Sequence, residues 1–381
     1  MFRRPVLRSC GARPRVWVAP PATARAFTPT ARSCRSDPTH PASEPDASRP
    51  LAFAFDIDGV LKAGNTVLDA ARRALAILEG NNPLGRRVPY IFITNGGGPS
   101  EVDRAKNLSK NFGLEVKPDQ VIQAHTVLQS LTKRFGNKPV LMIGGPDYPP
   151  GASRTVMNGY GFEDVYTAHD VHAWAPSSWP FSRVPEAQKA ALRHADFSKV
   201  KFSAVLVFHD SRDWGRDIQY ICDVLRSPAG TFGVVGDDTH PQPFLAFTHA
   251  DLLWGNDFSA ARFGQGAFQT AVRAVYEETS GRKLEATTFG KPQQLTYEYA
   301  NELVKNQLSV ADDVRPSVWM VGDNPASDIA GANNFGWKSA LVRTGVYRDA
   351  AGPPAHKPTV LVDDVEVAVR TALKREWGVD M

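Results

Sequence analysis

Cysteine and long apolar runs are both scarce in this sequence. Only three of its 381 residues are cysteines, and Cys10 and Cys34 lie within the first 36 residues. Cys222 is therefore alone in the remainder, which excludes an internal disulfide or a cysteine zinc cluster there. The sequence also contains no run of about 18 or more apolar residues, so it predicts no transmembrane segment.

Acidic residues and lysine are absent from residues 1–36, which hold eight arginines. The formal net charge of +4 therefore comes from this tail, since the other residues comprise 36 basic and 40 acidic side chains, a balance of −4. A mildly acidic body predicts no nucleic-acid partner. A tail rich in arginine, alanine, serine and proline, without a continuous apolar core, is typical of a mitochondrial transit peptide.

The stretch Arg25–Cys34, "RAFTPTARSC", supports that interpretation, because it resembles the two-step mitochondrial processing pattern of arginine, any residue, phenylalanine and a later hydroxyl residue. We therefore expect a mitochondrial protein, in the matrix, whose mature chain begins near residues 35–43. The alternative is a disordered, arginine-rich N-terminus that is not a targeting signal. Residues 37–50, "SDPTHPASEPDASR", have the composition of a linker.

Strand-like and helix-like segments then alternate. Residues 51–55 predict a buried strand, 69–79 a helix with Asp69 as N-cap, and 88–95 a second strand. The following glycines predict a turn, then a helix that opens near Ser100 and stops at Gly113. This order predicts an α/β fold with a parallel sheet and crossover helices.

The middle of the sequence, residues 130–257, reads as a separate smaller α/β module. Strands are expected within 138–145, 202–210 and 243–254. Residues 166–200 contain "AWAPSSWPFSRVP" and predict a long aromatic and proline-rich loop or insertion. His169 and His172 have no evident partner ligand and are expected at the surface. Alternation resumes with a helix at 265–279 and strands at 317–324 and 337–345.

Polar side chains follow the predicted strands where each one ends. Asp56 and Asp58 follow 51–55, Thr94 follows the next strand, and Asp323 and Asp328 follow the strand near 320. Ligands of open parallel sheets bind beyond the carboxyl ends of the strands. Four carboxylates converging there would repel one another without a cation, and an oxygen-only set suits Mg²⁺.

Each motif also has a simpler interpretation when taken alone. Asp56-x-Asp58-Gly59 could open a calcium loop, but the later ligand positions hold Val60, Leu61 and Val67. "GDNPASD" could be an Asx-capped turn at the start of a helix. Lys291 in "FGKP" could be a solvated surface lysine.

The motifs taken together resemble the haloacid dehalogenase (HAD) superfamily of phosphohydrolases. "DIDGV", "TNGGG", "GKP" and "GDNPASDIAGANNFGWKSALVRTGV" occur in that order, with the long insert typical of class II, subfamily A, and the sequence is most similar to the cat-eye-syndrome critical-region hydrolase group. The resemblance covers about residues 51–350. It implies a Rossmann-like doubly wound parallel core, 51–129 and 258–381, with an inserted α/β cap domain of the C2 type at 130–257.

The resemblance also implies a role for each motif residue. Asp56 would be the nucleophile and Asp58 the general acid and base, with the Asp58 carbonyl also meeting the metal. Mg²⁺ would be held by Asp56, Asp58 and Asp323, with Asp328 either a further ligand or the residue that orients a ligand. The phosphate would be bound by the Thr94 hydroxyl, the backbone of Asn95 and Gly96, and Lys291.

The segment after the expected strand 203–208 supplies candidates for substrate contact in the cap. Arg212 and Arg216 flank Trp214 and could hold an anionic or planar group by hydrogen bonds and stacking. The alternative is that both arginines pair with Asp213 and Asp217 on a solvated helix start.

The sequence thus predicts a Mg²⁺-dependent phosphohydrolase that acts on a small phosphorylated metabolite through an aspartyl-phosphate. The alternative is a protein of the same fold with little turnover, a binding or scaffold component linked to glycerophospholipid biosynthesis. Neither the substrate nor the oligomeric state follows from the sequence.

Overall fold

The computed structural model describes residues 44–381 except 147, 235, 237, 238, 255–257, 259, 261 and 312. The expected transit peptide, 1–36, and the first part of the expected linker lie outside the described residues. In the described part of the chain, no helix is long and apolar enough to cross a bilayer.

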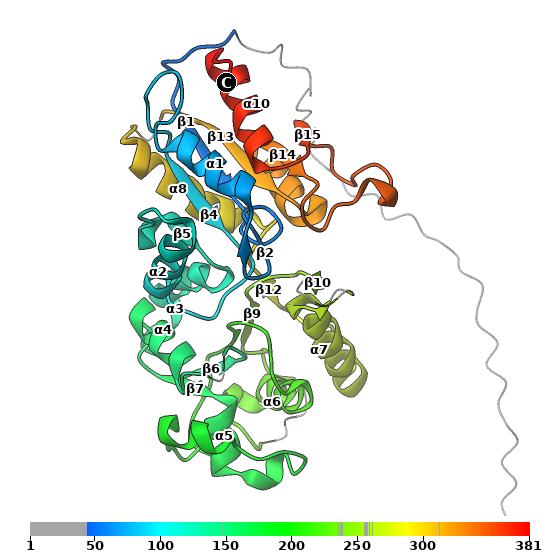
Figure 1. Cartoon of the computed structure of the whole chain (residues 1–381). Helices are drawn as coiled ribbons and strands as arrows, with labels where there is room; N and C mark the ends of the chain where they lie inside the picture. Colours follow the sequence, from blue (N-terminus) through cyan, green and yellow to red (C-terminus); the bar gives the residue numbers. More distant parts are fainter. Residues whose placement is uncertain are drawn as a thin grey trace, which may run out of the picture. The chain divides into compact units, whose positions relative to one another are not determined.

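The first sheet has six strands, all parallel, in the order β15-β14-β13-β1-β4-β5 (Figure 1). When these strands are numbered 1 to 6 along the chain and read from β5, the order is 3-2-1-4-5-6. This is the order of a Rossmann-like doubly wound sheet, as predicted. Its strands are β1 (Leu51–Phe55), β4 (Tyr90–Ile93), β5 (Val121–Ile122), β13 (Ser317–Gly322), β14 (Lys338–Val342) and β15 (Val360–Val362).

Helices cover both faces of this sheet because successive strand residues point to opposite sides. Phe53 and Phe55 of β1 pack with α1 (Asp69–Leu78), α2 (Glu101–Phe112) and α10 (Val365–Trp377). Ala52 and Ala54 pack with α8 (Gln294–Leu308) and α9 (Ala330–Phe335). Apolar residues on both sides explain why these strands read as continuous hydrophobic runs.

The second sheet is also parallel, in the order β12-β9-β8-β6-β7. Helices again lie on both faces, with α5, α6 and α7 on one and α3 and α4 on the other. The elements are β6 (Val140–Ile143), β7 (Val165–Thr167), β8 (Ala204–Val207), β9 (Phe244–Phe247), β12 (Thr287–Thr288), α3 (Thr132–Phe135), α4 (Ala152–Tyr160), α5 (Ala168–Trp174), α6 (Trp214–Arg226) and α7 (Gln265–Ser280).

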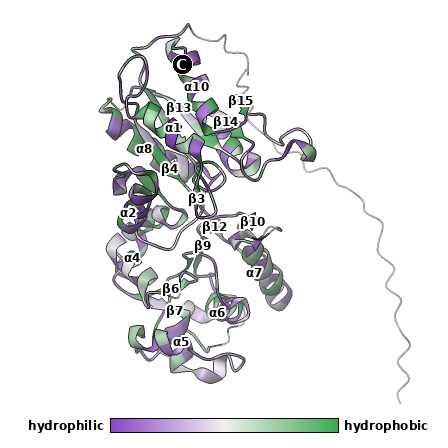
Figure 2. Cartoon of the chain, viewed as in Figure 1, coloured by the Kyte–Doolittle hydropathy of each residue, from purple (hydrophilic) through white to green (hydrophobic). Residues whose placement is uncertain are grey.

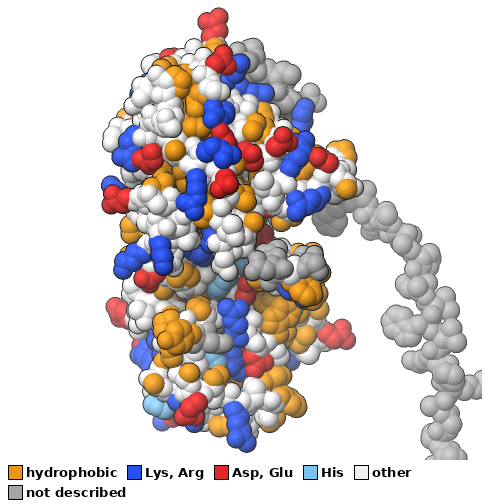
Figure 3. Space-filling model, in the orientation of Figure 1, with side chains coloured by type: hydrophobic (Ala, Val, Ile, Leu, Met, Phe, Trp, Pro, Cys, Tyr) orange, Lys and Arg blue, Asp and Glu red, His pale blue; other side chains and the backbone are white. Residues whose placement is uncertain are grey.

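Two short antiparallel pairs complete the described strands, β2 (Lys62–Ala63) with β3 (Thr66–Val67), and β10 (Leu253–Trp254) with β11 (Arg262–Phe263). Figure 2 shows hydrophobic residues along the strands of the first sheet and a largely hydrophilic α2. On the face drawn in Figure 3, basic and acidic side chains are interspersed.

The division of the chain between the two sheets bears on the predicted cap. Residues 130–257 contain four of the five strands of the second sheet, and β12 lies beyond them at Thr287–Thr288. The cap boundaries at 130 and 257 stay a prediction. The pairing of β12 with β9 favours a later second boundary, after Thr288.

Three local expectations need correction. Leu68, not Asp69, is the N-cap of α1, and no side chain caps that helix end. Residues 166–174 are not loop but the end of β7 and all of α5, whose N-cap Thr167 accepts a hydrogen bond from the Asp170 N–H. His172 is buried rather than at the surface.

Candidate active site

The predicted site lies where the order of the first sheet reverses. β1 and β13 are neighbours, with Phe55 opposite Val321, and the Asp56 N–H donates to the Val321 carbonyl across 2.9 Å. From β1 the chain continues to β4 and β5 on one side, and from β13 to β14 and β15 on the other. Asp56 and Asp323 therefore flank the crevice in which such sheets bind ligands.

Three buried carboxylates and one ammonium group meet there. One oxygen each of Asp56, Asp323 and Asp328 lies within 4.8 Å of the others. Lys291 Nζ lies 2.7 Å from Asp56 Oδ1 and 2.7 Å from Asp328 Oδ1. Lys291 is therefore not a solvated lysine, and its exposed fraction is 2%.

The turn after β13 fixes Asp328. Residues Pro325–Ile329 form a π-helical turn, and Asn324 caps it by accepting a hydrogen bond from the Ala326 N–H. Asp328 Oδ2 accepts hydrogen bonds from the N–H groups of Asp323 and Asn324, at 3.1 and 3.0 Å. The simple interpretation of "GDNPASD" as an Asx-capped turn is thus correct locally, and the same turn aims Asp328 Oδ1 at Lys291.

Two glycines make room for Asp323. A Cβ on Gly345 would lie 1.8 Å from Asp323 Oδ2, and a Cβ on Gly59 would lie 2.3 Å from the same atom. The Val346 N–H donates to this oxygen across 2.6 Å. Any side chain at Gly59 or Gly345 would displace the carboxylate.

Burial and crowding set the electrostatics of this cluster. Burial raises the pKa of Asp56, and Lys291 opposes that rise. Burial, with Asp56 and Asp328 close by, raises the pKa of Asp323 well above its ordinary value. Burial alone would lower the pKa of Lys291, but Asp328 and Asp56 outweigh it and raise that pKa.

The cluster fits a divalent cation by its donor set and its charge. Three carboxylates and one ammonium group leave two negative charges uncompensated when all are ionised. Oxygen donors alone are what Mg²⁺ prefers. Asp56, Asp323 and Asp328 are the residues that would hold it.

The loop after β4 carries Thr94, Asn95 and Gly96 to the same place. The Gly96 N–H donates to Thr94 Oγ1 across 2.9 Å. A Cβ on Gly96 would lie 3.1 Å from Thr94 Oγ1 and 3.9 Å from Asp58 Oδ2, so this glycine keeps the space between them open. Asp58 is exposed, unlike Asp56.

Asn95 joins this loop to Lys291 and to the end of the second sheet. Its Oδ1 accepts from the Lys291 N–H at 2.8 Å, and its Nδ2 donates to the Lys291 carbonyl and to Asp251 Oδ2 at 3.1 and 2.9 Å. The side chain of Asn95 therefore positions Lys291, a role that the sequence did not reveal.

Asp251 and Arg104 were not predicted from the sequence. Asp251 follows β9 and contacts the site by accepting a hydrogen bond from Asn95. Arg104, on α2, donates to Gln123 Oε1, and burial lowers its pKa while nearby Asp58 opposes this. A positively charged residue in the first turn of the helix after the glycine loop is a sequence signal that could have identified Arg104 as a candidate.

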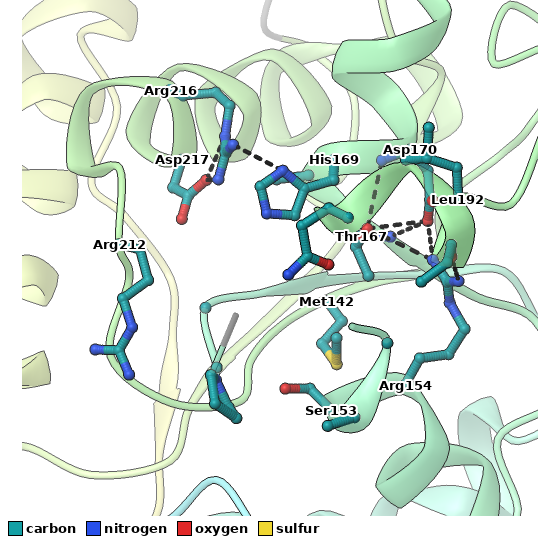
Figure 4. Close-up of a pocket in the computed structure, with 18 residues that line it drawn as sticks. Met142, Ser153, Arg154, Thr167, His169, Asp170, Leu192, Arg212, Arg216 and Asp217 are labelled. Atoms are coloured by element: carbon teal, nitrogen blue, oxygen red, sulfur yellow. Dashed lines mark hydrogen bonds and ion pairs between the residues drawn. The ribbon is translucent and has the colours of Figure 1, made fainter. Parts of the chain in front are cut away.

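The cap candidates do not act as one group. Arg212 and Arg216 line one pocket at the carboxyl ends of β6, β7 and β8 (Figure 4). Trp214 does not line this pocket. Trp214 instead packs edge-on against Phe268 of α7, with ring centroids 5.4 Å apart.

Of the pairs in the alternative interpretation, the structure shows the one between Arg216 and Asp217. Arg216 Nε and Nη2 donate to Asp217 Oδ1 at 2.9 and 2.8 Å, but both residues are buried, so the helix start is not solvated. Asp213 caps α6 by accepting from the Arg216 N–H. Arg212 is exposed.

Comparisons with known proteins identify the family and the fold. A family model described as a haloacid dehalogenase-like hydrolase matches residues 53–163, and one described as HAD-hydrolase-like matches residues 288–368. A mitochondrial hydrolase of Saccharomyces cerevisiae is 39% identical over 353 residues, which cover 86% of this chain and 97% of the relative. The chain belongs to the haloacid dehalogenase-like hydrolases.

A second relative, from Schizosaccharomyces pombe, is named a cardiolipin synthase (CMP-forming) / mitochondrial hydrolase fusion protein. It is 35% identical over 340 residues, 87% of this chain, and the match spans 55% of the relative. Among solved structures, a 4-nitrophenylphosphatase of Thermotoga maritima superposes with a TM-score of 0.57 at 19% identity, over 84% of this chain and 95% of that one. A Pyrococcus horikoshii protein of unassigned function gives 0.59 at 21%, over 84% and 99%. These structures share the fold.

Proposed function

We propose that this protein is a Mg²⁺-dependent phosphohydrolase that removes the phosphoryl group from a small phosphorylated metabolite. The observation that carries the proposal is the Lys291 ammonium group bound between Asp56 and Asp328, beside Asp323. A buried cation between carboxylates at a sheet switch point suits a ligand whose charge is spread over several oxygens. The 4-nitrophenylphosphatase with the same fold supports phosphomonoesters as the substrate class.

Asp56 is the proposed nucleophile. Its Oδ1 is bound by Lys291, which leaves Oδ2 to attack phosphorus in line with the leaving oxygen. The bond from Oδ2 to phosphorus forms as the bond from phosphorus to the ester oxygen breaks, and the electron pair of that bond leaves with the alcohol oxygen. An aspartyl-phosphate at Asp56 results.

Asp58 is the proposed proton carrier. Asp58 is exposed, whereas Asp56 is buried beside Lys291. As general acid, Asp58 gives a proton to the departing oxygen, then as general base it accepts one from the water that attacks the aspartyl-phosphate. Phosphate leaves, and Asp56 is restored.

The remaining residues bind the phosphoryl oxygens. Thr94 donates its hydroxyl hydrogen, and the Gly96 N–H orients this hydroxyl by donating to Thr94 Oγ1. The Asn95 N–H is a further proposed donor, and Lys291 supplies positive charge. Mg²⁺, held by Asp56, Asp323 and Asp328 with the Asp58 carbonyl, would neutralise charge on the transferring group. Arg212 is the cap side chain proposed to reach the rest of the substrate, since Trp214 and Arg216 are engaged by Phe268 and Asp217.

The proposed location is the mitochondrion, with the matrix as the compartment. The names of the two fungal relatives support this, as does the arginine-rich tail. The fusion of one relative with a cardiolipin synthase favours a second candidate function, a component of glycerophospholipid biosynthesis with little turnover of its own.

Hydrolysis of 4-nitrophenyl phosphate by the purified chain separates these candidates. We expect turnover that EDTA removes and added Mg²⁺ restores, followed by faster turnover of one compound in a panel of phosphorylated metabolites. Inactivity on the aryl phosphate and on the whole panel, with Mg²⁺ present, would favour the scaffold.

A further inference from the structure

A second group of metal-binding side chains lies outside the carboxylate cluster. It consists of His209 and Asp210, which follow β8, and His249, which follows β9. β8 and β9 are parallel neighbours, with Val207 opposite Phe247, so their carboxyl ends lie together. One coordinating atom of each of the three side chains lies within 4.8 Å of the other two.

These side chains face one another without hydrogen bonding. Asp210 Oδ1 lies 3.8 Å from His249 Nε2, and Asp210 Oδ2 lies 3.9 Å from His209 Nδ1. Both distances exceed a hydrogen bond. They are about half an ångström longer than the roughly 3.4 Å that separates two ligands across a tetrahedral zinc ion.

Several polar atoms of this group are buried and lack a partner. Among the residues that the structure describes, neither ring nitrogen of His249 has a hydrogen-bond partner, nor do His209 Nδ1 and Asp210 Oδ1. The His249 side chain is only 5% exposed. Buried polar atoms are almost always paired, so three unpaired atoms that face one another, His209 Nδ1, Asp210 Oδ1 and His249 Nε2, indicate a bound group.

Asp251 lies beyond the far edge of the His249 ring, where a metal-binding histidine usually has a carboxylate partner, but at more than hydrogen-bond distance. The Nε2 edge of the His249 ring faces Asp210, and its Nδ1 lies 3.8 Å from Asp251 Oδ2 on the other edge. A carboxylate on the far nitrogen fixes the tautomer and orientation of a ligating imidazole. Asp251 also accepts the hydrogen bond from Asn95, which positions Lys291.

The donor set differs in kind from that of the first cluster. Two imidazole nitrogens and one carboxylate oxygen suit Zn²⁺ and similar transition metals, whereas Mg²⁺ prefers oxygen alone. Three protein ligands leave a coordination position for water. Gly97 faces this place from the first sheet, where an added Cβ would lie 3.6 Å from His209 Nδ1.

We propose that His209 Nδ1, Asp210 and His249 Nε2 bind one divalent transition-metal ion of the zinc class. This site is separate from the Mg²⁺ cluster. The bound ion ties together the loops after β8 and β9 and, through Asp251 and Asn95, lies next to the loop that positions Lys291.

A Co²⁺ titration tests this site without any measurement of turnover. The full chain is stripped with a chelator, refilled with excess Mg²⁺ and titrated with Co²⁺, whose visible absorption reports nitrogen ligation. We expect one equivalent to bind. His249→Ala should weaken binding by more than the ~10- to 100-fold that loss of an outer contact causes, and the near-isosteric Asp210→Asn should also weaken it if His249→Ala does not fold.

Two control variants separate this site from others. His194→Ala removes an exposed histidine that is not part of the cluster, and Asp323→Asn disables the carboxylate cluster. Both should keep the wild-type Co²⁺ absorption, even if Asp323→Asn lacks phosphatase activity. No stoichiometric Co²⁺ binding by the wild type would overturn the proposal, as would equal affinity in the wild type, His249→Ala and Asp210→Asn, or loss of binding in either control.

Discussion

Arg212 and Arg216, four positions apart, show how environment decides what a side chain does at the residue scale. Arg216 is 5% exposed and holds Asp217, which is 1% exposed. Ser211 Oγ donates to the other Asp217 oxygen across 2.7 Å. Arg212 lies at the pocket of Figure 4 and is exposed.

Arg216→Ala is therefore predicted to destabilise the fold, and Arg212→Ala is not. Removal of Arg216 leaves the buried Asp217 charge uncompensated, which costs about 3–5 kcal/mol. Substitution of an exposed arginine such as Arg212 changes stability by about 0.5 kcal/mol or less. Urea unfolding of both variants checks this, and equal midpoints would contradict the assigned burial.

The sequence predicted the catalytic candidates better than their surroundings. Asp56 and Asp323 were identifiable because each directly follows an apolar strand, and parallel strand ends meet. His249 and Asp251 were not, because their place beside Asn95 depends on the contact between the second sheet and the first. A single sequence carries no signal for that contact.

At the element scale, α1 and α2 begin differently. Ser100 caps α2 by accepting a hydrogen bond from the Asp103 N–H, while α1 follows Leu68 without a side-chain cap. Asp69 was expected to cap α1. It is instead the first helical residue, and its negative charge interacts favourably with the helix dipole.

Ser100→Ala should lower the free energy of unfolding by about 0.5–2 kcal/mol, because the Asp103 N–H loses its acceptor. The matched change Asp69→Ala removes only a dipole contact and should cost about 0.3–1 kcal/mol. Denaturant midpoints of the two variants give the comparison. A larger loss for Asp69→Ala would contradict the assigned caps.

The role assigned to the loop after β14 is to leave space for the Asp323 carboxylate, not to supply a reacting group. Gly345→Ala should abolish hydrolysis of an aryl phosphate, because the new Cβ would overlap Asp323 Oδ2. Gly159→Ala, in α4, meets no atom within 4 Å and should keep wild-type turnover. Steady-state rates check both, and an active Gly345→Ala would argue against Asp323 as part of the site.

Helices with a clear hydrophobic period were predicted well, and very short elements were not. The helices near 69–79 and 265–279 appear as Asp69–Leu78 and Gln265–Ser280. β12 has two residues, too few to show an alternation of apolar and polar side chains. Its pairing with β9 is visible only in the structure. α5 was missed because Trp174 at its end and the prolines and Trp179 after it favoured a loop.

At the scale of the whole molecule, two parallel sheets place functional groups at their carboxyl ends. The first brings together Asp56, Asp323 and Asp328, and the second brings together His209, Asp210 and His249. The doubly wound order was predictable from the alternation of strands and helices and from the family resemblance.

The arginine-rich tail lies outside the described residues, and its role stays a prediction. If it is a transit peptide, import and processing should leave a mature chain that begins near residues 35–43. N-terminal sequencing of the protein isolated from mitochondria measures this directly. Recovery of a cytosolic chain that retains residues 1–34 would contradict the prediction.

Asp56 is proposed to attack phosphorus, and the rest of the mechanism depends on this step. The most direct measurement compares aryl phosphate turnover by the wild type and Asp56→Asn, with Mg²⁺, at equal folded concentration. The substitution keeps the size of the side chain but removes the nucleophilic oxygen anion, so kcat should fall by more than about 10³-fold while the unfolding midpoint shows a protein that still folds. Wild-type turnover by Asp56→Asn would contradict the assignment of the nucleophile and, with it, the proposed mechanism.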